Sequence, residues 1–247
     1  MTLLITENLS KRYGGVVAVD QVGLRLEKGE ILGLMGANGA GKTTLFSMLA
    51  GNVAPSSGRI LLNGRQINGM PPERVSRLGI ARTFQIVRPF SGMTVLENVM
   101  VGALYGASRF RSRRQAEPQC RRLLKEAGLG AKAEHPASTL NLAARKRLEI
   151  VRALATRPQI LLLDEVLAGL NATEVGEALQ LISEMHARYG LSIIIVEHVM
   201  KALMRLSHRI MVLHEGKQLM DGSPDDVSRD PRVIKAYLGE RRYGAAA

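Results

Sequence analysis

Apolar and polar positions follow two different patterns in segments that are predicted to be strands. Val22, Leu24 and Leu26 alternate with polar or glycine neighbours, which is the spacing of a half-buried strand. Other apolar segments are short and nearly uninterrupted, as in strands that are covered on both faces. These segments lie at residues 31–35, 160–163 and 193–196. The pattern therefore predicts a chain rich in strands, several of them buried in a parallel sheet.

Helical spacing appears between these strands. Leu45, Met48 and Leu49 recur every three or four positions, as expected for a helix with one buried face. A later segment repeats this spacing with Val175, Leu179, Ile182 and Met185. Strands that alternate with helices predict an α/β fold with a mainly parallel sheet.

The strand signals fade between about residues 94 and 154, where helical signals replace them. Thr94 and Glu97 have the spacing of a capping box, and we expect Pro118 near the start of a second helix that ends at Gly128. This segment is predicted to be an inserted helical lobe. Its cations form either a solvated face or a docking surface for anionic lipid or an acidic partner. They are Arg109, Arg111, Arg113, Arg114, Arg121, Arg122 and Lys125.

The last part of the chain carries two helix signals. Ser223, Pro224 and Asp226 predict one helix start, and a final helix is expected over residues 231–238. Residues 244–247 are interpreted as a frayed tail.

Composition limits the class of protein. The chain has 247 residues, of which 46% are hydrophobic and 23% charged, which excludes disordered, collagen-like and coiled-coil proteins. The single cysteine, Cys120, cannot form an internal disulfide, and neither an apolar run of membrane-spanning length nor an apolar signal core is found, so we expect a cytosolic location. A net charge of +12 favours phosphate-rich or other anionic partners. The low aromatic content of 4% argues against a single-strand nucleic-acid binder.

Residues 36–43 have the pattern of a phosphate-binding loop. Two glycines, Gly36 and Gly41, are followed by Lys42 and Thr43, and the loop lies between a predicted strand and a predicted helix. Glycines let successive backbone N–H groups point at phosphate oxygens, Lys42 adds a positive charge, and Thr43 offers a hydroxyl to Mg²⁺. The pattern predicts nucleotide binding, whereas the alternative is an ordinary glycine-rich turn.

Two acids follow the buried segment 160–163. Asp164 and Glu165 come at the carboxyl end of a predicted strand, where open α/β sheets bind ligands. Asp164 is expected to hold Mg²⁺, and Glu165 to polarise the water that attacks a γ-phosphate. Taken alone, the segment is also compatible with a strand that ends in solvent.

Together these two motifs resemble those of the ATP-binding cassette ATPases, and the resemblance covers nearly the whole chain. It implies an α/β fold with a P-loop NTPase (RecA-like) core, a mainly parallel sheet, an N-terminal antiparallel β region and an inserted helical subdomain. The expected single domain spans residues 1–247, with the core at 1–86 and 156–222, the helical subdomain at 87–155 and C-terminal helices and tail at 223–247.

The resemblance also implies roles for individual residues. Tyr13 lies where the family places an aromatic residue that stacks on adenine, Gln85 fits a loop that contacts Mg²⁺ and water, and His198 fits a histidine that contacts the γ-phosphate. The implied cofactors are ATP and Mg²⁺. The expected ATP-binding residues are Tyr13, Gly36, Asn38, Gly39, Ala40, Gly41, Lys42, Thr43, Thr44, Asn141 and Ala143. The expected catalytic residues are Glu165, His198 and Gln85, and the expected metal-binding residues are Thr43, Gln85 and Asp164.

The family's signature segment is altered in this chain. The family has Leu-Ser-Gly-Gly-Gln, whereas residues 140–144 read Leu-Asn-Leu-Ala-Ala. In the family this segment closes over ATP that is bound by a second subunit. Asn141 can still donate a hydrogen bond, but Leu142 and Ala143 make a close approach harder. Residues 145–147 are all cationic and are expected in the first helical turn, where they either attract an anion or splay into water and pair with acids.

Two further departures follow the acid pair. Val166 replaces a usual proline, and Asn171 replaces a common aspartate in a loop that crosses the family's dimer interface. We expect weaker communication between the two ATP sites.

Within the family, the chain is most similar to the ATPase subunits of branched-chain amino acid importers and their relatives, a subgroup that includes a lipopolysaccharide-export ATPase. Characteristic segments are 82–85, 93–99, 147–150, 168–171, 173–174, 196–198 and 236–239. The implied partners are membrane permease subunits that contact residues 85–97, a second ATPase subunit and, indirectly, a solute-binding protein. No nucleic acid is expected, and the implied location is the cytoplasmic face of the membrane, as a peripheral subunit. Three alternatives remain: a lipid or lipopolysaccharide export ATPase, a soluble nucleic-acid-associated ATPase, and a regulatory subunit with little turnover.

Overall fold

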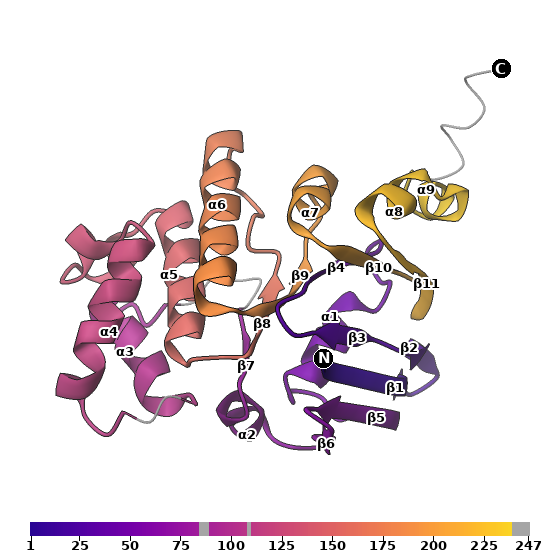
Figure 1. Cartoon of the computed structure of the whole chain (residues 1–247), viewed down its shortest axis with the longest axis horizontal. Coiled ribbons are helices and arrows are strands. Elements are labelled where there is room, and N and C mark those ends of the chain that lie inside the picture. The colour runs from indigo at the N-terminus through magenta and orange to yellow at the C-terminus, as the bar shows by residue number, and fades with distance from the viewer. Residues whose placement is uncertain (84–88, 108–109, 239–247) are drawn as a thin grey trace. The chain divides into compact units, whose positions relative to one another are not determined.

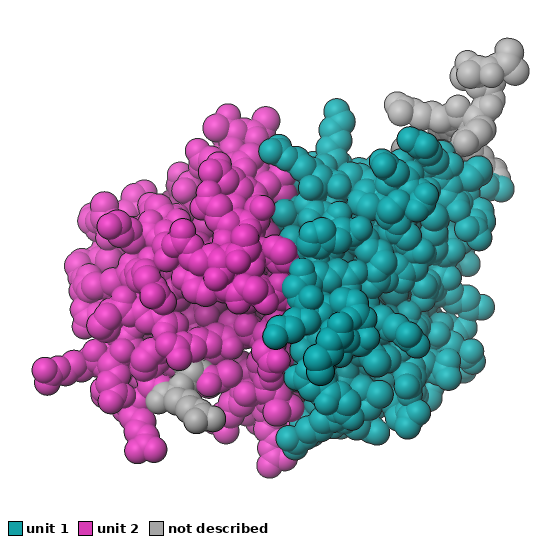
Figure 2. All heavy atoms as spheres, viewed as in Figure 1, with its two compact units in different colours: residues 1–70, 194–247 teal, residues 71–193 magenta. Residues whose placement is uncertain are grey.

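The chain begins with strands that form an antiparallel sheet. In the computed structural model, which describes residues 1–83, 89–107 and 110–238, the chain forms two units: residues 1–70 with 194–247, and residues 71–193 (Figure 2). They are called unit 1 and unit 2 and are described separately. The first sheet lies in unit 1, with the order β2-β1-β5-β6 and with β3 also paired to β1 (Figure 1). Its strands are β1 (Thr2–Tyr13), β2 (Val16–Val22), β3 (Arg25–Glu27), β5 (Ser57–Leu62) and β6 (Arg65–Gln66).

The alternating segment around Val22 is broken into two strands. Its three apolar side chains are buried as predicted, but β2 ends at Val22 and β3 begins at Arg25. The Thr6 hydroxyl explains the break, because it donates to the Val22 carbonyl at 3.0 Å and accepts from the Leu24 amide at 2.8 Å. A side chain thus satisfies backbone groups that a continuous strand would pair elsewhere.

A second group of strands in unit 1 leads to the predicted phosphate loop. The fully buried β4 (Ile31–Met35) pairs in parallel with β10 (Arg209–His214), which pairs antiparallel with β11 (Lys217–Gly222). The apolar run at 31–35 is therefore a buried strand, as predicted. The helices of unit 1 are α1 (Lys42–Leu49), α7 (Met200–Leu206), α8 (Pro224–Arg229) and α9 (Pro231–Leu238), and the last two confirm the predicted C-terminal helices.

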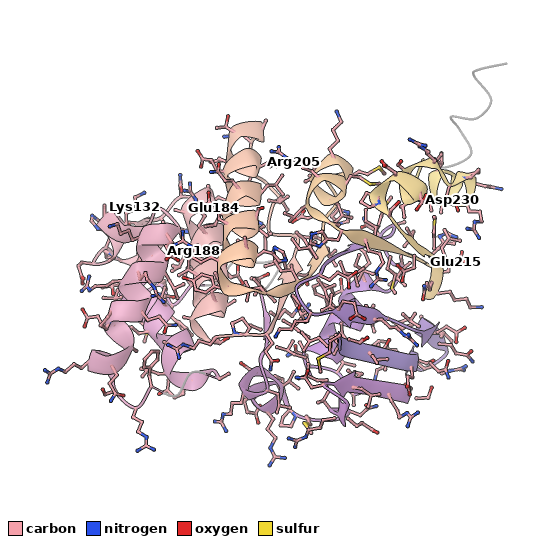
Figure 3. The ribbon with its side chains drawn as sticks, viewed as in Figure 1. Lys132, Glu184, Arg188, Arg205, Glu215 and Asp230 are labelled. Carbon is pink, nitrogen blue, oxygen red and sulfur yellow. The ribbon has the colours of Figure 1, made fainter. Side chains whose placement is uncertain are left out.

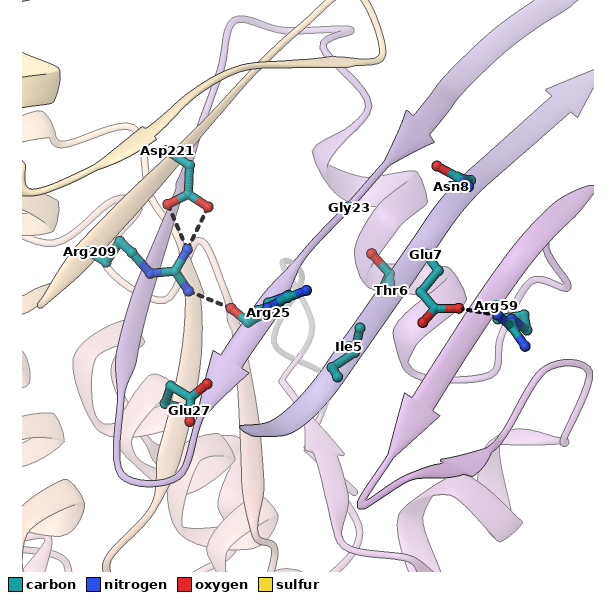
Figure 4. A pocket seen from close by; sticks show the side chains of 10 residues that line it. All are labelled: Ile5, Thr6, Glu7, Asn8, Gly23, Arg25, Glu27, Arg59, Arg209 and Asp221. Carbon is teal, nitrogen blue, oxygen red and sulfur yellow. Dashed lines mark hydrogen bonds and ion pairs between the residues drawn. The ribbon is translucent and has the colours of Figure 1, made fainter. Parts of the chain in front are cut away.

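A pocket of unit 1 is lined by side chains that form ion pairs with one another (Figure 4). Arg209 Nη1 lies 2.6 Å from Asp221 Oδ1, and its Nε lies 2.7 Å from Glu30 Oε1. Across the pocket, Arg59 pairs with Glu7 at 2.6 Å. The Arg209 pairs connect β10 with β11 and with the turn before β4, and the Arg59–Glu7 pair connects β5 with β1. We interpret this pocket as a structural network.

Unit 2 contains a short parallel pair of strands and a group of helices. Here β7 (Ile80–Arg82) pairs in parallel with β8 (Ile160–Asp164), and β9 (Ser192–Val196) crosses the boundary between the units. The helices α3, α4 and α5 lie side by side (Figure 1). The helices are α2 (Pro72–Arg77), α3 (Val95–Tyr105), α4 (Arg113–Glu126), α5 (Leu142–Ala155) and α6 (Ala172–Tyr189), with 3-10 turns at Gly130–Lys132 and Ala137–Thr139.

The helix starts of unit 2 confirm one prediction and correct another. Thr94 and Glu97 form the expected capping box, with bonds of 3.1 and 2.9 Å. Pro118, in contrast, lies inside α4 and not near its start. The Ser112 side chain caps the helix by accepting from the Gln115 amide, and a buried stripe that includes Cys120 stabilises the helix through the proline.

The expected boundaries of the helical subdomain, residues 87 and 155, differ from those of the two units, and that assignment stays a prediction. Among the residues described above, no helix combines the length and the hydropathy needed to span a bilayer.

Candidate functional site

The predicted phosphate loop runs from the end of β4 into α1. A Cβ atom at Gly36 would lie 2.6 Å from the Leu213 carbonyl oxygen, and one at Gly41 would lie 2.4 Å from the Ala18 carbonyl oxygen. Gly41 also has φ = 100°, in the left-handed region. Only glycine fits these two positions, so the glycine pattern follows from the shape of the loop.

Lys42 is folded over this loop. Its side chain is only 6% exposed, and Nζ donates to the carbonyls of Gly36 at 2.7 Å and Ala37 at 3.0 Å. The loop residues Asn38 and Gly39 and the first-turn Thr43 are exposed. No acidic residue lies in the first turn of α1, so nothing there opposes the attraction of this helix start for an anion. The arrangement suits a phosphate group.

Tyr13 lies in the same unit, at the end of β1. It pairs with Val16 of β2, the strand whose Ala18 carbonyl packs against Gly41. Its side chain is 49% exposed, and Lys11 Nζ lies 5.0 Å from the ring centroid. About half of Tyr13 is therefore accessible to solvent, next to the hairpin that supports the loop, which leaves surface for stacking on a base.

Asp164 ends β8 and is paired with a buried arginine. Asp164 is 3% exposed, and its Oδ2 lies 2.8 Å from Nη2 of Arg82, the last residue of the neighbouring β7. The Asp164 amide donates to the Thr83 hydroxyl at 3.1 Å. Arg82 was not among the predicted site residues. The sequence signals for it are its place directly after two apolar residues and its position in the characteristic segment 82–85.

We expect Arg82→Ala to lower the free energy of unfolding by about 3–5 kcal/mol, because it leaves the Asp164 carboxylate buried without this charge partner. Chemical denaturation with urea measures the change. Arg59→Ala is the matched control: it breaks the exposed pair with Glu7 and should cost about 1 kcal/mol or less. Equal effects of the two substitutions would contradict a special role for the buried pair.

Glu165 follows Asp164 in an unusual backbone conformation. Its φ is 50°, in the left-handed region, which asparagine and aspartate visit more readily than glutamate. The Glu165 carbonyl accepts a hydrogen bond of 2.9 Å from Nζ of Lys146, whose side chain is 6% exposed. Strained residues of this kind cost about 1–3 kcal/mol and cluster at functional sites. Lys146 is a second residue that was not predicted as part of the site.

The altered signature segment forms the start of α5. The Asn141 side chain caps the helix by accepting from the Ala144 amide at 3.0 Å, so its oxygen is engaged within the chain. Leu142, which replaces a glycine of the family's motif, is 45% exposed. The neighbouring cations have protein partners, which favours pairing over the anion-binding interpretation. Arg145 donates to the Ser138 carbonyl, Lys146 to the Glu165 carbonyl, and Arg147 to Glu177.

The remaining predicted residues are divided between the described and undescribed parts of the chain. His198 is exposed in the segment between β9 and α7, next to the buried Glu197. Gln85, with residues 86–88 of the expected permease-contact segment, lies outside the described residues, as does Arg109. Tyr13, Lys42 and His198 belong to unit 1, whereas Asp164, Glu165 and Asn141 belong to unit 2. The combined site stays a prediction.

The donor atoms suit magnesium. Thr43 offers a hydroxyl oxygen and Asp164 a carboxylate, which are the hard oxygen ligands that Mg²⁺ prefers. Mg²⁺ commonly binds through one or two such groups together with substrate phosphates and water. The residues therefore fit this ion.

Comparisons with known proteins agree with this reading. Residues 19–168 match the family described as ABC transporter, and residues 217–243 match the family described as branched-chain amino acid ATP-binding cassette transporter. The high-affinity branched-chain amino acid transport ATP-binding protein LivG of Escherichia coli K12 is 41% identical over 250 residues, covering 96% of this chain and 98% of that protein. The protein BraF of Pseudomonas aeruginosa, with the same description, is 39% identical over 250 residues with the same coverage.

A solved structure shows the same fold. The crystal structure of an ATP-binding cassette of an ABC transporter in its ADP conformation superposes with a TM-score of 0.89 at 28% identity, covering 97% of this chain and 100% of that one. The predicted α/β class with a P-loop NTPase core is thereby confirmed.

Proposed function

Because the chain belongs to the ATP-binding cassette family of ABC transporter ATPases, we propose that it is the ATP-hydrolysing subunit of an importer for branched-chain amino acids. The observation that carries the cargo assignment is the identity of about two residues in five, over nearly the full length, to transport subunits described for these amino acids. The import direction and the membrane partners are part of this proposal, and the likeness to the same transport proteins supports them.

In the proposed site, unit 1 binds the nucleotide. The N–H groups of residues 36–43 and the start of α1 hold the phosphates, while Lys42 turns from its carbonyl partners toward the outer phosphate oxygens. Tyr13 stacks on the base. Thr43 and Asp164 are the described residues that would hold Mg²⁺, which neutralises charge on the phosphates.

Unit 2 supplies the group that orients water in this proposal. Glu165 accepts a proton from the attacking water at its carboxylate, and the Lys146 bond fixes the backbone from which this side chain projects. By the resemblance, His198 would contact the γ-phosphate, and Gln85, which lies outside the described residues, would contact water and Mg²⁺. No covalent enzyme intermediate is required, because positioning and charge stabilisation account for most phosphoryl-transfer catalysis.

The proposed assembly contains membrane permease subunits and a second ATPase subunit, at the cytoplasmic face of the membrane. The exposed start of α5 supports a second subunit, because Leu142 presents apolar surface where the family closes over its neighbour's ATP. A solute-binding protein contributes indirectly.

An uptake measurement tests the cargo. In cells that carry the gene, replacing the native protein with the Glu165→Gln variant should abolish energy-dependent uptake of labelled leucine, isoleucine and valine. Uptake of an unrelated sugar is the control. Undiminished uptake of all three amino acids would reject the importer assignment. Loss of a surface lipid instead would indicate the export alternative, and tight duplex DNA or RNA binding at physiological salt would indicate the nucleic-acid alternative.

Tyr13→Ala should weaken ATP binding about tenfold, since base stacking on an aromatic ring contributes about 1–3 kcal/mol. Tyr13→Phe keeps the ring and should bind like the native chain. Fluorescence titration with a labelled ATP analogue measures both. If the alanine and phenylalanine variants bind equally well, Tyr13 does not stack on the base.

A further inference from the structure

The cationic surface of α4 borders a pocket that the nucleotide site does not use. This pocket of about 300 Å³ lies within unit 2, at the lower end of the volumes typical for small-molecule sites. α4, α5, the segment after α5, the end of α6 and the residue before β9 line it. The lining residues are Gln119, Arg122, Leu123, Leu154, Arg157, Pro158, Tyr189 and Leu191.

The pocket combines an apolar interior with cationic groups at its rim. Leu123, Leu154 and Leu191 are buried side chains that offer aliphatic surface, while Arg122 and Arg157 are exposed. No aspartate or glutamate belongs to the lining. A few polar groups beside aliphatic walls are typical of sites that bind small organic molecules.

Arg122 is the available cation. Within the described residues it forms neither a hydrogen bond nor an ion pair, in contrast to Arg121 beside it, which pairs with Glu117 and Glu134 at 2.7 Å. Its charge acts on Tyr189, another residue of the lining, and opposes the burial and the hydrogen bond to Glu126 that together raise the pKa of that phenol. Arg122 can therefore pair with an anionic ligand without first breaking an existing ion pair.

Arg157, the second exposed cation of the lining, is held in place by neighbouring side chains. It donates twice to Gln119 Oε1, with Nε at 3.0 Å, and its guanidinium lies 4.8 Å from the centroid of the Phe110 ring. Its φ of 57° is left-handed, which is unusual for a residue with a long side chain. The backbone and two side chains thus fix this guanidinium at the pocket.

The acid that bonds to Tyr189 of the lining, Glu126, is already neutralised. Glu126 accepts from Arg188, labelled in Figure 3, at 2.7 Å and from the Tyr189 hydroxyl at 2.6 Å. Its charge is therefore compensated within the protein. The surroundings favour an anionic ligand, and they offer no acidic side chain in the lining to an ammonium group.

The geometry points to a binding site for a short-chain aliphatic monocarboxylate, whose carboxylate pairs with Arg122 and whose hydrocarbon tail packs against Leu123, Leu154 and Leu191. A pocket of about 300 Å³ suits a short hydrocarbon tail better than a long acyl chain. The ligand is distinct from the proposed cargo, because an amino acid would bring an ammonium group into a rim of arginines.

Isothermal titration of the full chain with three compounds of the same branched tail tests this site. Isocaproate carries only the carboxylate, leucine adds an ammonium group, and isohexanol has a neutral head. We expect saturable binding of isocaproate, and affinities for leucine and isohexanol that are at least about tenfold weaker. No saturable binding of isocaproate, or equal binding of the three compounds, would overturn the proposal.

Two substitutions in α4 test whether the Arg122 side chain contributes to isocaproate binding. Arg122→Gln should weaken isocaproate binding about tenfold or more, because a hydrogen-bonded charge pair is lost. Arg114→Gln removes the same charge from an exposed position of the same helix that does not line the pocket, and it should bind like the native chain. Amide resonances of Tyr189 and Leu191 should shift on titration of the native chain. Equal affinities of the two variants, or shifts confined to other residues, would contradict the site.

Discussion

Glu165→Gln is expected to lower the rate of ATP hydrolysis at least about a hundredfold, because an amide cannot accept the proton of the attacking water and general-base catalysis contributes about 10²–10⁴. ATP binding should remain, since the substitution preserves the shape of the side chain and leaves the phosphate loop intact. Phosphate release under steady-state conditions measures the first effect, and equilibrium binding of labelled ATP measures the second.

Glu184→Gln is the matched control for this experiment. Glu184 is exposed on α6, where it accepts from Gln180, so the same chemical change should leave turnover unaltered. Hydrolysis that persists in Glu165→Gln would assign the base to another residue. Loss of both binding and hydrolysis would mean that Glu165 acts on structure, a possibility that its left-handed backbone makes worth measuring by thermal unfolding.

Lys42→Ala is expected to weaken ATP binding about ten- to a hundredfold, because it removes charge-assisted hydrogen bonds to phosphate worth about 1.5–3 kcal/mol. Hydrolysis at saturating ATP should fall as well, since the positive charge no longer offsets charge on the outer phosphate. Equilibrium dialysis with labelled ATP measures the affinity, and the unfolding temperature shows whether the loop survives the loss of two carbonyl contacts.

The corresponding control is Lys28→Ala, which removes an exposed lysine before β4 in the same unit. Its ATP affinity should equal that of the native chain. Unchanged affinity in Lys42→Ala would remove the basis for placing phosphate at residues 36–43.

The phosphate loop could be predicted because its motif lies within eight consecutive residues, 36–43. Gly36 and Gly41 lie where a Cβ would collide with carbonyl oxygens, and such positions leave a direct trace in the sequence. Asp164 and Glu165 could be placed for a similar reason, because they terminate a buried apolar segment that forms a strand. The capping box at Thr94 depends on residues three positions apart and was also found.

Features that depend on distant partners were missed. Arg82 meets Asp164 only because β7 and β8 pair in parallel, with Arg82 opposite Leu162, and no local pattern encodes that register. Arg147 likewise pairs with Glu177, on another helix. The position of Pro118 was misjudged because its preference for helix starts is weaker than the combined effect of the Ser112 cap and the buried stripe of α4.

The bond between Lys146 and the Glu165 carbonyl has a consequence for how experiments on the signature segment are read. Lys146, on α5, donates a hydrogen bond to the backbone carbonyl of Glu165, the residue proposed to act on water, and both residues belong to one polypeptide. Displacing α5 by mutation would therefore disturb that subunit's own chemistry as well as any contact with its neighbour. Mixed dimers separate the two origins of a defect. In one dimer the altered α5 and the Glu165→Gln substitution lie on the same subunit, and in the other they lie on opposite subunits.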